Sequence, residues 1–240
     1  MTQPPCKRIL LKISGESLLG AQTAGISVEA TQKLADVLMR IHAEQFEVAV
    51  VIGGGNIFRG LQLKELGMAR SHADQIGMLA TMMNGLALKQ ALEMRGADVH
   101  LISGLECPAV AERFQLSRSG KALQEGSFLI CVGGTGHPYF TTDTAAALRA
   151  SELRVDLLIK ATKVRGVFNR DPVKFPDAIF YPEVSYEKVL ADRLGIMDAT
   201  AISMCQSNRV PVFVCSLERL FAAPLRELLA RKEGTFIVGE

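Results

Sequence analysis

The sequence predicts an α/β protein in which helices pack on a mainly parallel sheet. Five short segments are nearly continuous in apolar, β-rich residues, which is typical of strands buried on both faces of a parallel sheet. Segments with helical periodicity separate these strands, and this alternation implies an α/β sandwich with right-handed crossovers. Glycine-rich or polar turns follow several strands, at the ends where parallel sheets bind ligands.

The expected elements follow one another along the 240 residues. The strands are 8–13, 47–52, 98–103, 127–132 and 156–161, followed by two short strands at 210–215 and 234–239. Helices are expected over 28–45, 73–96, 142–153 and 220–232. The segment 165–185 is rich in Pro, Asp and aromatic residues and is expected to form a loop or hairpin. The sequence shows no internal repeat or linker, so we expect a single domain spanning 1–240.

The overall composition narrows the class of function. Hydrophobic residues make up 48% of the chain and the net charge is +2, which favours neither nucleic acid nor a membrane surface as a partner. No apolar run reaches the roughly 18 residues of a membrane helix, and the first residues do not resemble a signal peptide, so we expect a cytoplasmic protein. The five cysteines and four histidines show no metal-ligand spacing.

The first and second predicted strands each end in a candidate phosphate-binding feature. Lys12 lies between two apolar residues and must find an anion or reach water at a sheet edge. The second strand runs into "GGGNIFRG", where bare glycine backbone and a helix start can present N–H groups to phosphate, with Arg59 adding a bidentate contact. The alternative is that these glycines form only a tight turn and bind no phosphate. The stretch is neither a Walker A loop nor the dinucleotide fingerprint.

The fourth and fifth strands repeat this arrangement. "GGTGHPYFTTDTAAALRA" is a glycine turn followed by a Thr-Thr-Asp-Thr cluster that opens a helix, where the hydroxyl groups can cap the helix or bind a phosphoryl group. Lys160 repeats the pattern of Lys12 at the end of the fifth strand. Two glycine turns, two strand-end lysines and Arg59 together indicate a cradle for several phosphates. Gly85, within the predicted helix 73–96, indicates a close approach to another helix, such as one across a subunit interface.

Five motifs carry a resemblance to a known family. "KRILLKISGESL", "VVIGGGNIFRG", "ADQIGMLATMMNGLAL", "GTGHPYFTTDTAAALRA" and "KATKVRGVFNRDP" resemble the bacterial-type UMP kinases of the amino acid kinase superfamily, over nearly the whole chain. The resemblance implies a three-layer αβα sandwich around a mainly parallel sheet. It also implies transfer of the ATP γ-phosphoryl group to UMP, giving ADP and UDP in pyrimidine nucleotide biosynthesis, with Mg²⁺ as cofactor.

The resemblance also implies roles for particular residues. Catalysis would fall to Lys12 and Lys160, with Asp143 and Asp198 as acidic partners that orient lysines or magnesium. ATP would contact Lys12, Ile13, Ser14, Gly15, Gly55 and Arg59 through its phosphates and Thr162, Phe168 and Asp171 through its nucleoside. UMP would contact Gly54, Asp74, Thr135, Gly136, His137, Pro138, Tyr139, Phe140, Thr141 and Thr142.

Regulation and assembly are implied in the same way. Members of this family are typically homohexamers that GTP activates and UTP inhibits. The segment Gly20, Ala21, Gln22, Thr23, Ala24 and Gly25 matches the activator loop. Two positions depart from the family pattern: Arg165 stands where aspartate is common, and His137 replaces a frequent asparagine.

Two alternatives stay open. The first is another kinase of the superfamily, one that phosphorylates acetylglutamate, aspartate or carbamate. The "GTGHPYFTTDT" run favours a nucleotide acceptor over these. The second is a protein that senses or stores nucleotides without turnover. The presence of both strand-end lysines argues against it, because simple binding does not require both.

Overall fold

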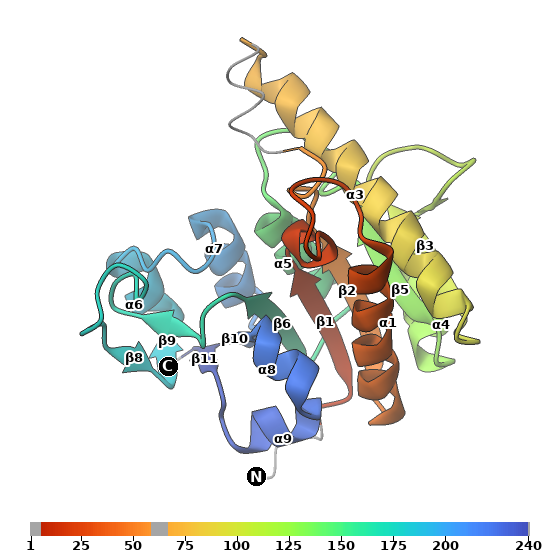
Figure 1. Ribbon diagram of the computed structural model, residues 1–240. Helices are drawn as coiled ribbons and strands as arrows, with labels where there is room; N and C mark the ends of the chain where they lie inside the picture. The colour runs from red at the N-terminus through yellow and green to blue at the C-terminus, as the bar shows by residue number, and fades with distance from the viewer. Residues whose placement is uncertain (1–5, 59–66, 240) are drawn as a thin grey trace.

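The structure is a computed structural model that describes residues 6–58 and 67–239. Within these ranges nine strands form one sheet in the order β4-β3-β5-β2-β1-β6-β10-β11-β9 (Figure 1). Paired neighbours run parallel except β10 and β11, which are antiparallel. The strands are β1 (Arg8–Ile13), β2 (Glu47–Ile52), β3 (Val99–Ser103), β4 (Glu112–Arg113), β5 (Phe128–Val132), β6 (Leu157–Thr162), β9 (Glu183–Ser185), β10 (Val212–Ser216) and β11 (Thr235–Val238).

Helices cover both faces of this sheet, so the predicted three-layer sandwich is confirmed (Figure 1). Alternate strand residues pack into opposite layers: Ile9 and Leu11 face one layer, and Leu10 faces the other. The first layer contains α1 (Val28–Ala43), α3 (Arg70–Glu93), α8 (Leu217–Ala222) and α9 (Leu225–Ala230). The second contains α4 (Leu116–Gln124), α5 (Thr142–Glu152), α6 (Tyr186–Ala191) and α7 (Ala199–Ser207).

The predicted helix over 220–232 is wrong, because two short helices replace it. Ala223 has extended backbone angles (φ −134°, ψ 157°) and precedes Pro224, which disfavours the helical conformation in the residue before it. The guanidinium of Arg40 donates hydrogen bonds to the carbonyls of Leu220, Phe221 and Ala223, so the end of α8 is satisfied from α1.

The predicted helix 73–96 is confirmed as α3, although the role expected for Gly85 is wrong. A Cβ at this position would meet the side chains of Val132, Leu101 and Ile130, which belong to β5 and β3. The glycine therefore allows the helix to lie close to the sheet of its own chain, and the close approach is not one between helices.

The segment 165–185 forms the hairpin that its composition predicts. β7 (Val167–Phe168) pairs antiparallel with β8 (Phe180–Tyr181) in a separate two-stranded sheet. The chain then enters β9, which adds a strand to the edge of the main sheet and was not predicted. None of the helices in the described ranges has both the length and the apolar character that a membrane span requires.

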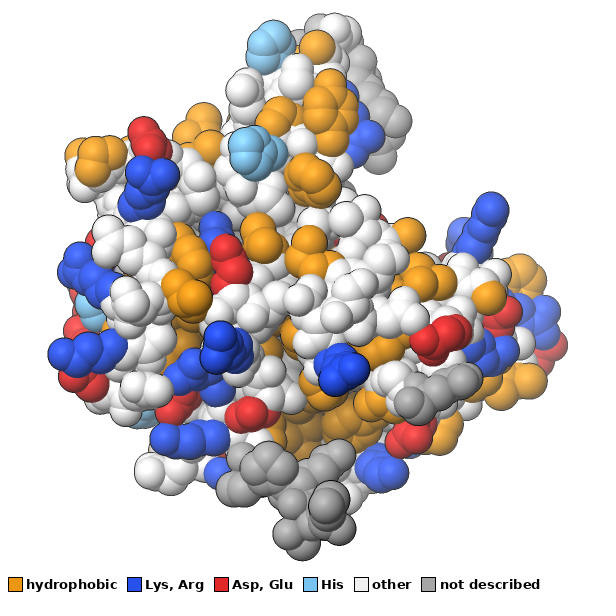
Figure 2. Space-filling view, turned by 180° about the vertical axis from the view of Figure 1, so that it is seen from behind, with side chains coloured by type: hydrophobic (Ala, Val, Ile, Leu, Met, Phe, Trp, Pro, Cys, Tyr) orange, Lys and Arg blue, Asp and Glu red, His pale blue; other side chains and the backbone are white. Residues whose placement is uncertain are grey.

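The carboxyl ends of four central strands lie at one edge of the sheet, because β5, β2, β1 and β6 are parallel neighbours. The turns that follow them, including the short 3₁₀ helix η1 (Gly15–Leu18), therefore gather at this edge. Acidic and basic side chains are interspersed on the face seen in Figure 2, as the low net charge suggests. This face therefore does not show a broad basic surface.

Candidate functional site

The two strand-end lysines converge on one carboxylate. Lys12 and Lys160 occupy paired positions of the neighbouring parallel strands β1 and β6. Lys12 Nζ lies 2.7 Å from Asp143 Oδ1, and Lys160 Nζ lies 2.7 Å from Asp143 Oδ2. All three side chains are between 12% and 14% exposed. The sheet register thus brings the two ammonium groups together near the carboxyl ends of β1 and β6, beside the turns that follow these strands.

This cluster perturbs the pKa values of its members. Burial tends to raise the pKa of Asp143, but the ammonium groups of Lys12 and Lys160 outweigh it and lower the pKa below 3.8. Burial lowers the pKa of Lys160 below 10.5; Asp143 opposes this effect and Lys12 adds to it. The cluster therefore places two lysine side chains around one carboxylate, at the edge of the sheet where the turns gather.

Asp198 acts on Lys160 through its charge, which raises the pKa of that lysine, while its own hydrogen bonds go to the starts of two helices. It is the N-cap of α7, where its Oδ1 accepts a hydrogen bond from the Ala201 N–H at 3.0 Å. Its carboxylate also accepts hydrogen bonds from the hydroxyls of Thr141 (2.5 Å) and Thr144 (3.0 Å). These bonds fasten the start of α5 to the start of α7, and α5 carries Asp143 on its first turn.

The three consecutive glycines serve two different purposes. A Cβ at Gly53 would lie 3.1 Å from the Gly15 nitrogen, and one at Gly54 would lie 2.7 Å from the Gly77 carbonyl oxygen of α3. A Cβ at Gly55 would meet no atom within 4 Å. The first two glycines therefore pack closely against the protein's own backbone, although Gly54 also lines a cavity with Gly55, whose added Cβ would meet none of the described residues. Arg59 lies outside the described residues.

A cavity of about 300 Å³ lies beyond β2 and β5 and brings together half of the residues predicted for UMP. Its wall includes Gly54, Asp74, Phe140, Thr141 and Thr142, with Met78 and Thr81 of α3. Gly55, predicted for ATP, lines this same cavity. The other predicted residues, 135–139, form the exposed or half-buried turn that leads into it.

Asp74 shapes this turn as well as lining the cavity. Its Oδ2 accepts a hydrogen bond from the Tyr139 N–H at 2.7 Å. Tyr139 has a φ of 73°, a left-handed conformation that is strained for a tyrosine. Arg70 donates to the Tyr139 carbonyl and lies 5.1 Å from its ring centroid. The start of α3 therefore holds the predicted acceptor turn in an otherwise unfavourable conformation.

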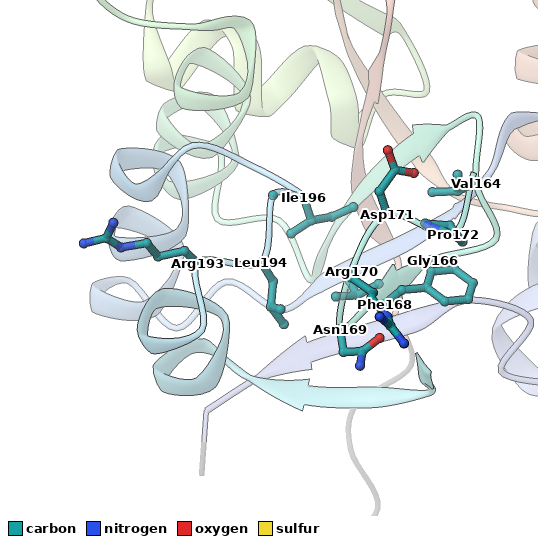
Figure 3. Close-up of a pocket in the computed structure, with 12 residues that line it drawn as sticks. Val164, Gly166, Phe168, Asn169, Arg170, Asp171, Pro172, Arg193, Leu194 and Ile196 are labelled. Carbon is teal, nitrogen blue, oxygen red and sulfur yellow. The ribbon is translucent and has the colours of Figure 1, made fainter. Parts of the chain in front are cut away.

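Two further cavities lie on the other side of the lysine pair. One, of about 460 Å³, is lined by Lys12, Ser14, Lys160, Thr162 and the ion pair Lys163–Glu16, whose atoms Nζ and Oε2 lie 2.6 Å apart. The other, of about 430 Å³, lies between the β7–β8 hairpin and the loop before α7. Figure 3 shows Leu194 and Ile196 on one side of it, with Phe168 and Asp171 on the other.

The predicted ATP residues are thus divided between these cavities. Thr162 lines the cavity that contains the lysines, whereas Phe168 and Asp171 line the other cavity. Ile13 is completely buried in the core, which leaves only its backbone to contact a ligand. Gly15 is buried too, and it packs against Gly53 and Asn56 in the turn that follows β2.

The predicted activator segment adjoins the cavity of the lysines. Gly20 lines that cavity and also a larger one of about 590 Å³, which Ala21 helps to line. At its other end, Gly25 exchanges two hydrogen bonds with Asn56 in the glycine turn, each 2.9 Å long. Gln22, Thr23 and Ala24 lie between these two attachments and are all exposed.

The two departures from the family pattern lie at the surface. Arg165 places its guanidinium carbon 4.4 Å from the ring centroid of Phe180, whose ring meets Phe168 edge-on with centroids 5.4 Å apart. This stack supports the aromatic wall of the 430 Å³ cavity. His137 is exposed and its backbone N–H donates to the Thr135 hydroxyl oxygen.

Sequence reasoning missed two asparagines behind the site. Asn56 and Asn84 are 3% and 0% exposed, and their side chains hydrogen-bond to each other. The only sequence signal was an asparagine within the apolar stretch "MMNGLAL", where a short amide is unfavourable in a helix interior.

The fold and the site define a class of phosphate-handling enzyme, and comparison with known proteins agrees with it. Residues 7–216 match the family model described as "Amino acid kinase family". That match covers most of the chain and includes both lysines and both glycine turns that border the site.

Individual relatives narrow the class. The chain is 51% identical over 232 residues to a uridylate kinase from Protochlamydia amoebophila, covering 96% of this chain and 92% of the relative. It is 44% identical to a uridylate kinase from Dichelobacter nodosus, covering 98% and 97%. Two solved structures are also similar: UMP kinase from Ureaplasma parvum (TM-score 0.90, 34% identity, covering 98% and 100%) and UMP kinase from Bacillus anthracis (TM-score 0.92, 32% identity, covering 99% and 98%). The chain therefore belongs to the uridylate kinases of the amino acid kinase family.

Proposed function

We propose that this protein transfers the γ-phosphoryl group of ATP to UMP, giving ADP and UDP, as a step of pyrimidine nucleotide biosynthesis. The relatives named as uridylate or UMP kinases support this activity across nearly the full length of the chain. The observation that carries the proposal is the convergence of Lys12 and Lys160 on Asp143, between a cavity suited to the acceptor and two suited to the donor.

The chemistry explains why such a site suits two nucleotides. The acceptor is a phosphate oxygen that is already anionic near neutral pH, so the reaction needs no general base. The main obstacle is repulsion between two polyanions, which costs on the order of 4 kcal/mol for each pair of unit charges 4 Å apart at an effective dielectric of 20. Phosphoryl transfer therefore depends mainly on positioning and on stabilising charge. Lys12 and Lys160 would supply that charge at the transferring group, and Asp143 would hold both ammonium groups in place.

We assign the ligands to the cavities as follows. UMP would occupy the cavity of Gly54, Asp74 and residues 140–142, with the turn 135–139 closing over it. The ATP phosphates would lie along residues 12–15 and Thr162, and the adenine would lie against Phe168, with Asp171 at its nucleoside. Gly55 lies on the acceptor side, where the ATP phosphates and the UMP phosphate would meet.

Mg²⁺ fits this site as an ion carried mainly by the nucleotide. In the described part of the chain, no group of three or more His, Cys, Asp or Glu side chains is arranged to hold a metal. The carboxylates of Asp143 and Asp198 already bind protein donors, so the phosphates would provide most of the ligands, as is usual for this ion. When bound, Mg²⁺ would neutralise phosphate charge, and Asp143 and Asp198 would support it.

Replacing Lys12 by alanine tests the proposal. We expect Lys12→Ala to lower kcat by about 10²–10³-fold, because it removes a charge that stabilises the transferring group. KM for UMP should change much less, since Lys12 lies on the donor side. The measurement is ADP release in a coupled assay. Lys121→Ala, at an exposed ion pair of α4, is the control and should leave kcat unchanged.

The choice of acceptor separates the proposal from its two alternatives. ADP formation should be fastest with UMP, in a panel that includes CMP, dUMP, acetylglutamate, aspartate and carbamate. Preference for a carboxylate or carbamate acceptor would indicate another kinase of the family. Tight UTP binding without ADP formation from any acceptor would instead identify a nucleotide-sensing protein.

Regulation, assembly and location are also proposed. GTP would activate and UTP would inhibit, and residues 20–25 would transmit the activation because Gly25 is bonded directly to the glycine turn. A homohexamer is supported by an apolar stripe on α3, where Leu79, Met83 and Leu86 are each about half exposed on one helix face. A cytoplasmic location stays a prediction from the sequence.

A further inference from the structure

Two buried asparagines lie behind the two turns proposed to bind phosphate: the turn after β1 that contains Gly15 and the turn after β2 that contains Gly53. Asn84 Nδ2 donates to Asn56 Oδ1 at 2.6 Å, and Asn56 Nδ2 donates to Asn84 Oδ1 at 2.9 Å. The remaining N–H of each amide reaches backbone: Asn84 donates to the Gly53 carbonyl at 2.7 Å and Asn56 to the Gly25 carbonyl at 2.9 Å. All four amide N–H groups and both side-chain oxygens are therefore used.

The pair is built into the core rather than exposed on it. Asn84 is fully buried in the middle of α3, among Met82, Gly85 and Leu88 on the inner helix face. An amide in such a place is unfavourable for the helix and costly to bury unless each polar atom is bonded. Its hydrogen bonds go to loops rather than to its own helix, so the helix does not explain its presence.

Three segments of the proposed site meet at this pair. The Gly53 N–H donates to the Ile13 carbonyl while the Gly53 carbonyl accepts from Asn84, so the Gly53 residue is held from both sides. A Cβ on Gly15 would lie 2.5 Å from Asn56 Oδ1, which shows that the first turn packs directly on the amide. Gly25, at the end of segment 20–25, exchanges two hydrogen bonds with Asn56.

We infer that Asn84 and Asn56 are positioning residues which hold the two phosphate-binding turns and segment 20–25 as one unit on α3. They touch neither nucleotide in this arrangement and act through the backbone of residues 15, 25 and 53. Because the turns are pre-organised by this unit, phosphates bind without first ordering the backbone. The inference rests on the proposed function for the identity of the ligands.

Asn84→Asp tests the inference, because the shape is kept while the Nδ2 donor becomes a carboxylate oxygen. That oxygen would face the Gly53 carbonyl and Asn56 Oδ1, both of which are acceptors. We expect the Kd of a non-hydrolysable ATP analogue, measured by calorimetry, to rise at least tenfold. Hydrogen exchange of residues 14–25 and 53–56, measured by mass spectrometry, should be at least tenfold faster.

Leu88→Ala is the matched control. Leu88 is fully buried on the same face of α3, about one turn after Asn84, and packs only in the apolar core. This variant should lower Tm through the lost packing and leave the Kd of the ATP analogue within twofold of the wild type. A purely structural role for Asn84 would make the two variants behave alike, with lower Tm but unchanged Kd and loop exchange, and this outcome would overturn the inference.

Asn56→Asp provides a second test from the loop side. It can be made even if Asn84→Asp does not fold. It removes the donors to Gly25 and to Asn84 and should raise the Kd and the exchange of residues 20–25 in the same way. Wild-type affinity in this variant would contradict the inference. Calorimetry needs no acceptor, so a wild-type protein that binds the analogue but forms no ADP with UMP would refute the proposed function and leave the positioning inference intact.

Discussion

Asp143 sets the charge state of the proposed site at the scale of single residues. It lies on the first turn of α5 and contacts two ammonium groups from two different strands. A buried carboxylate so placed is stabilised in its ionised form, and in turn it favours protonation of Lys160. Removing one member of a buried ion pair leaves the charge of the other member uncompensated. This destabilises a protein more than removing one member of a surface ion pair.

We expect Asp143→Asn to move the alkaline limit of activity to lower pH. The pKa of Lys160 is already lowered by burial, and Asp143 opposes that effect, so loss of the carboxylate lowers the pKa further. The ammonium group needed for transfer would then be lost at a lower pH. The measurement is kcat against pH from 7 to 10. Asp192→Asn is the control, because it removes a carboxylate from an exposed ion pair with Lys188 and should leave the pH profile unchanged. An alkaline limit at the same or higher pH in Asp143→Asn would contradict the assignment.

The β7–β8 hairpin is the element that builds the wall proposed for adenine. Its two strands have only two residues each, so their pairing alone is weak and side-chain contacts must support it. Phe180 provides these contacts, between Arg165 on one side and Phe168 on the other. The arginine that departs from the family pattern is therefore part of the support of this wall.

Phe180→Ala should raise KM for ATP several-fold and leave KM for UMP within twofold. The substitution removes the ring against which Phe168 rests, while the acceptor cavity lies on other elements. Steady-state kinetics with each substrate varied in turn would measure the two values. Ile179→Ala changes the adjacent, exposed side chain and is the control. Equal increases in both KM values would show that the hairpin does not act on ATP alone.

The whole molecule depends on α3, which has a different task on each face. Its inner face packs on β3 and β5 and carries Asn84, whereas its outer face exposes Leu79, Met83 and Leu86. Apolar side chains grouped on one exposed helix face favour contact with a second copy of the chain. Such a contact would lie directly behind the asparagine pair, and so behind both phosphate-binding turns.

Met83→Glu should dissociate the proposed assembly. A carboxylate at the centre of the stripe would be buried without a partner in the oligomer, whereas it would be solvated in the monomer. Light scattering coupled to size exclusion would measure the mass. Met94→Glu, at the exposed end of the same helix, should leave the mass unchanged. An unaltered mass for Met83→Glu would place the subunit contact elsewhere.

The sequence by itself determined the order of the central elements and the nature of the site. Continuous apolar runs specify strands buried on both faces, and a lysine near the end of such a run must find an anion or reach water, so Lys12 and Lys160 could be identified without coordinates. The glycine turns and the capping cluster of α5 are likewise local signals. Pro224 was also a local signal for the break between α8 and α9, although the apolar periodicity around it predicted one helix.

Only the tertiary structure decided which of these groups meet. Lys12 and Lys160 are far apart in the chain, and their convergence on Asp143 depends on the strand order that places β1 beside β6. The same holds for the asparagine pair and for the close packing of Gly53 and Gly54 against backbone from other elements. Local periodicity specifies which face of an element is buried; it carries no information on which distant element covers that face, because this is set by how all the layers pack together.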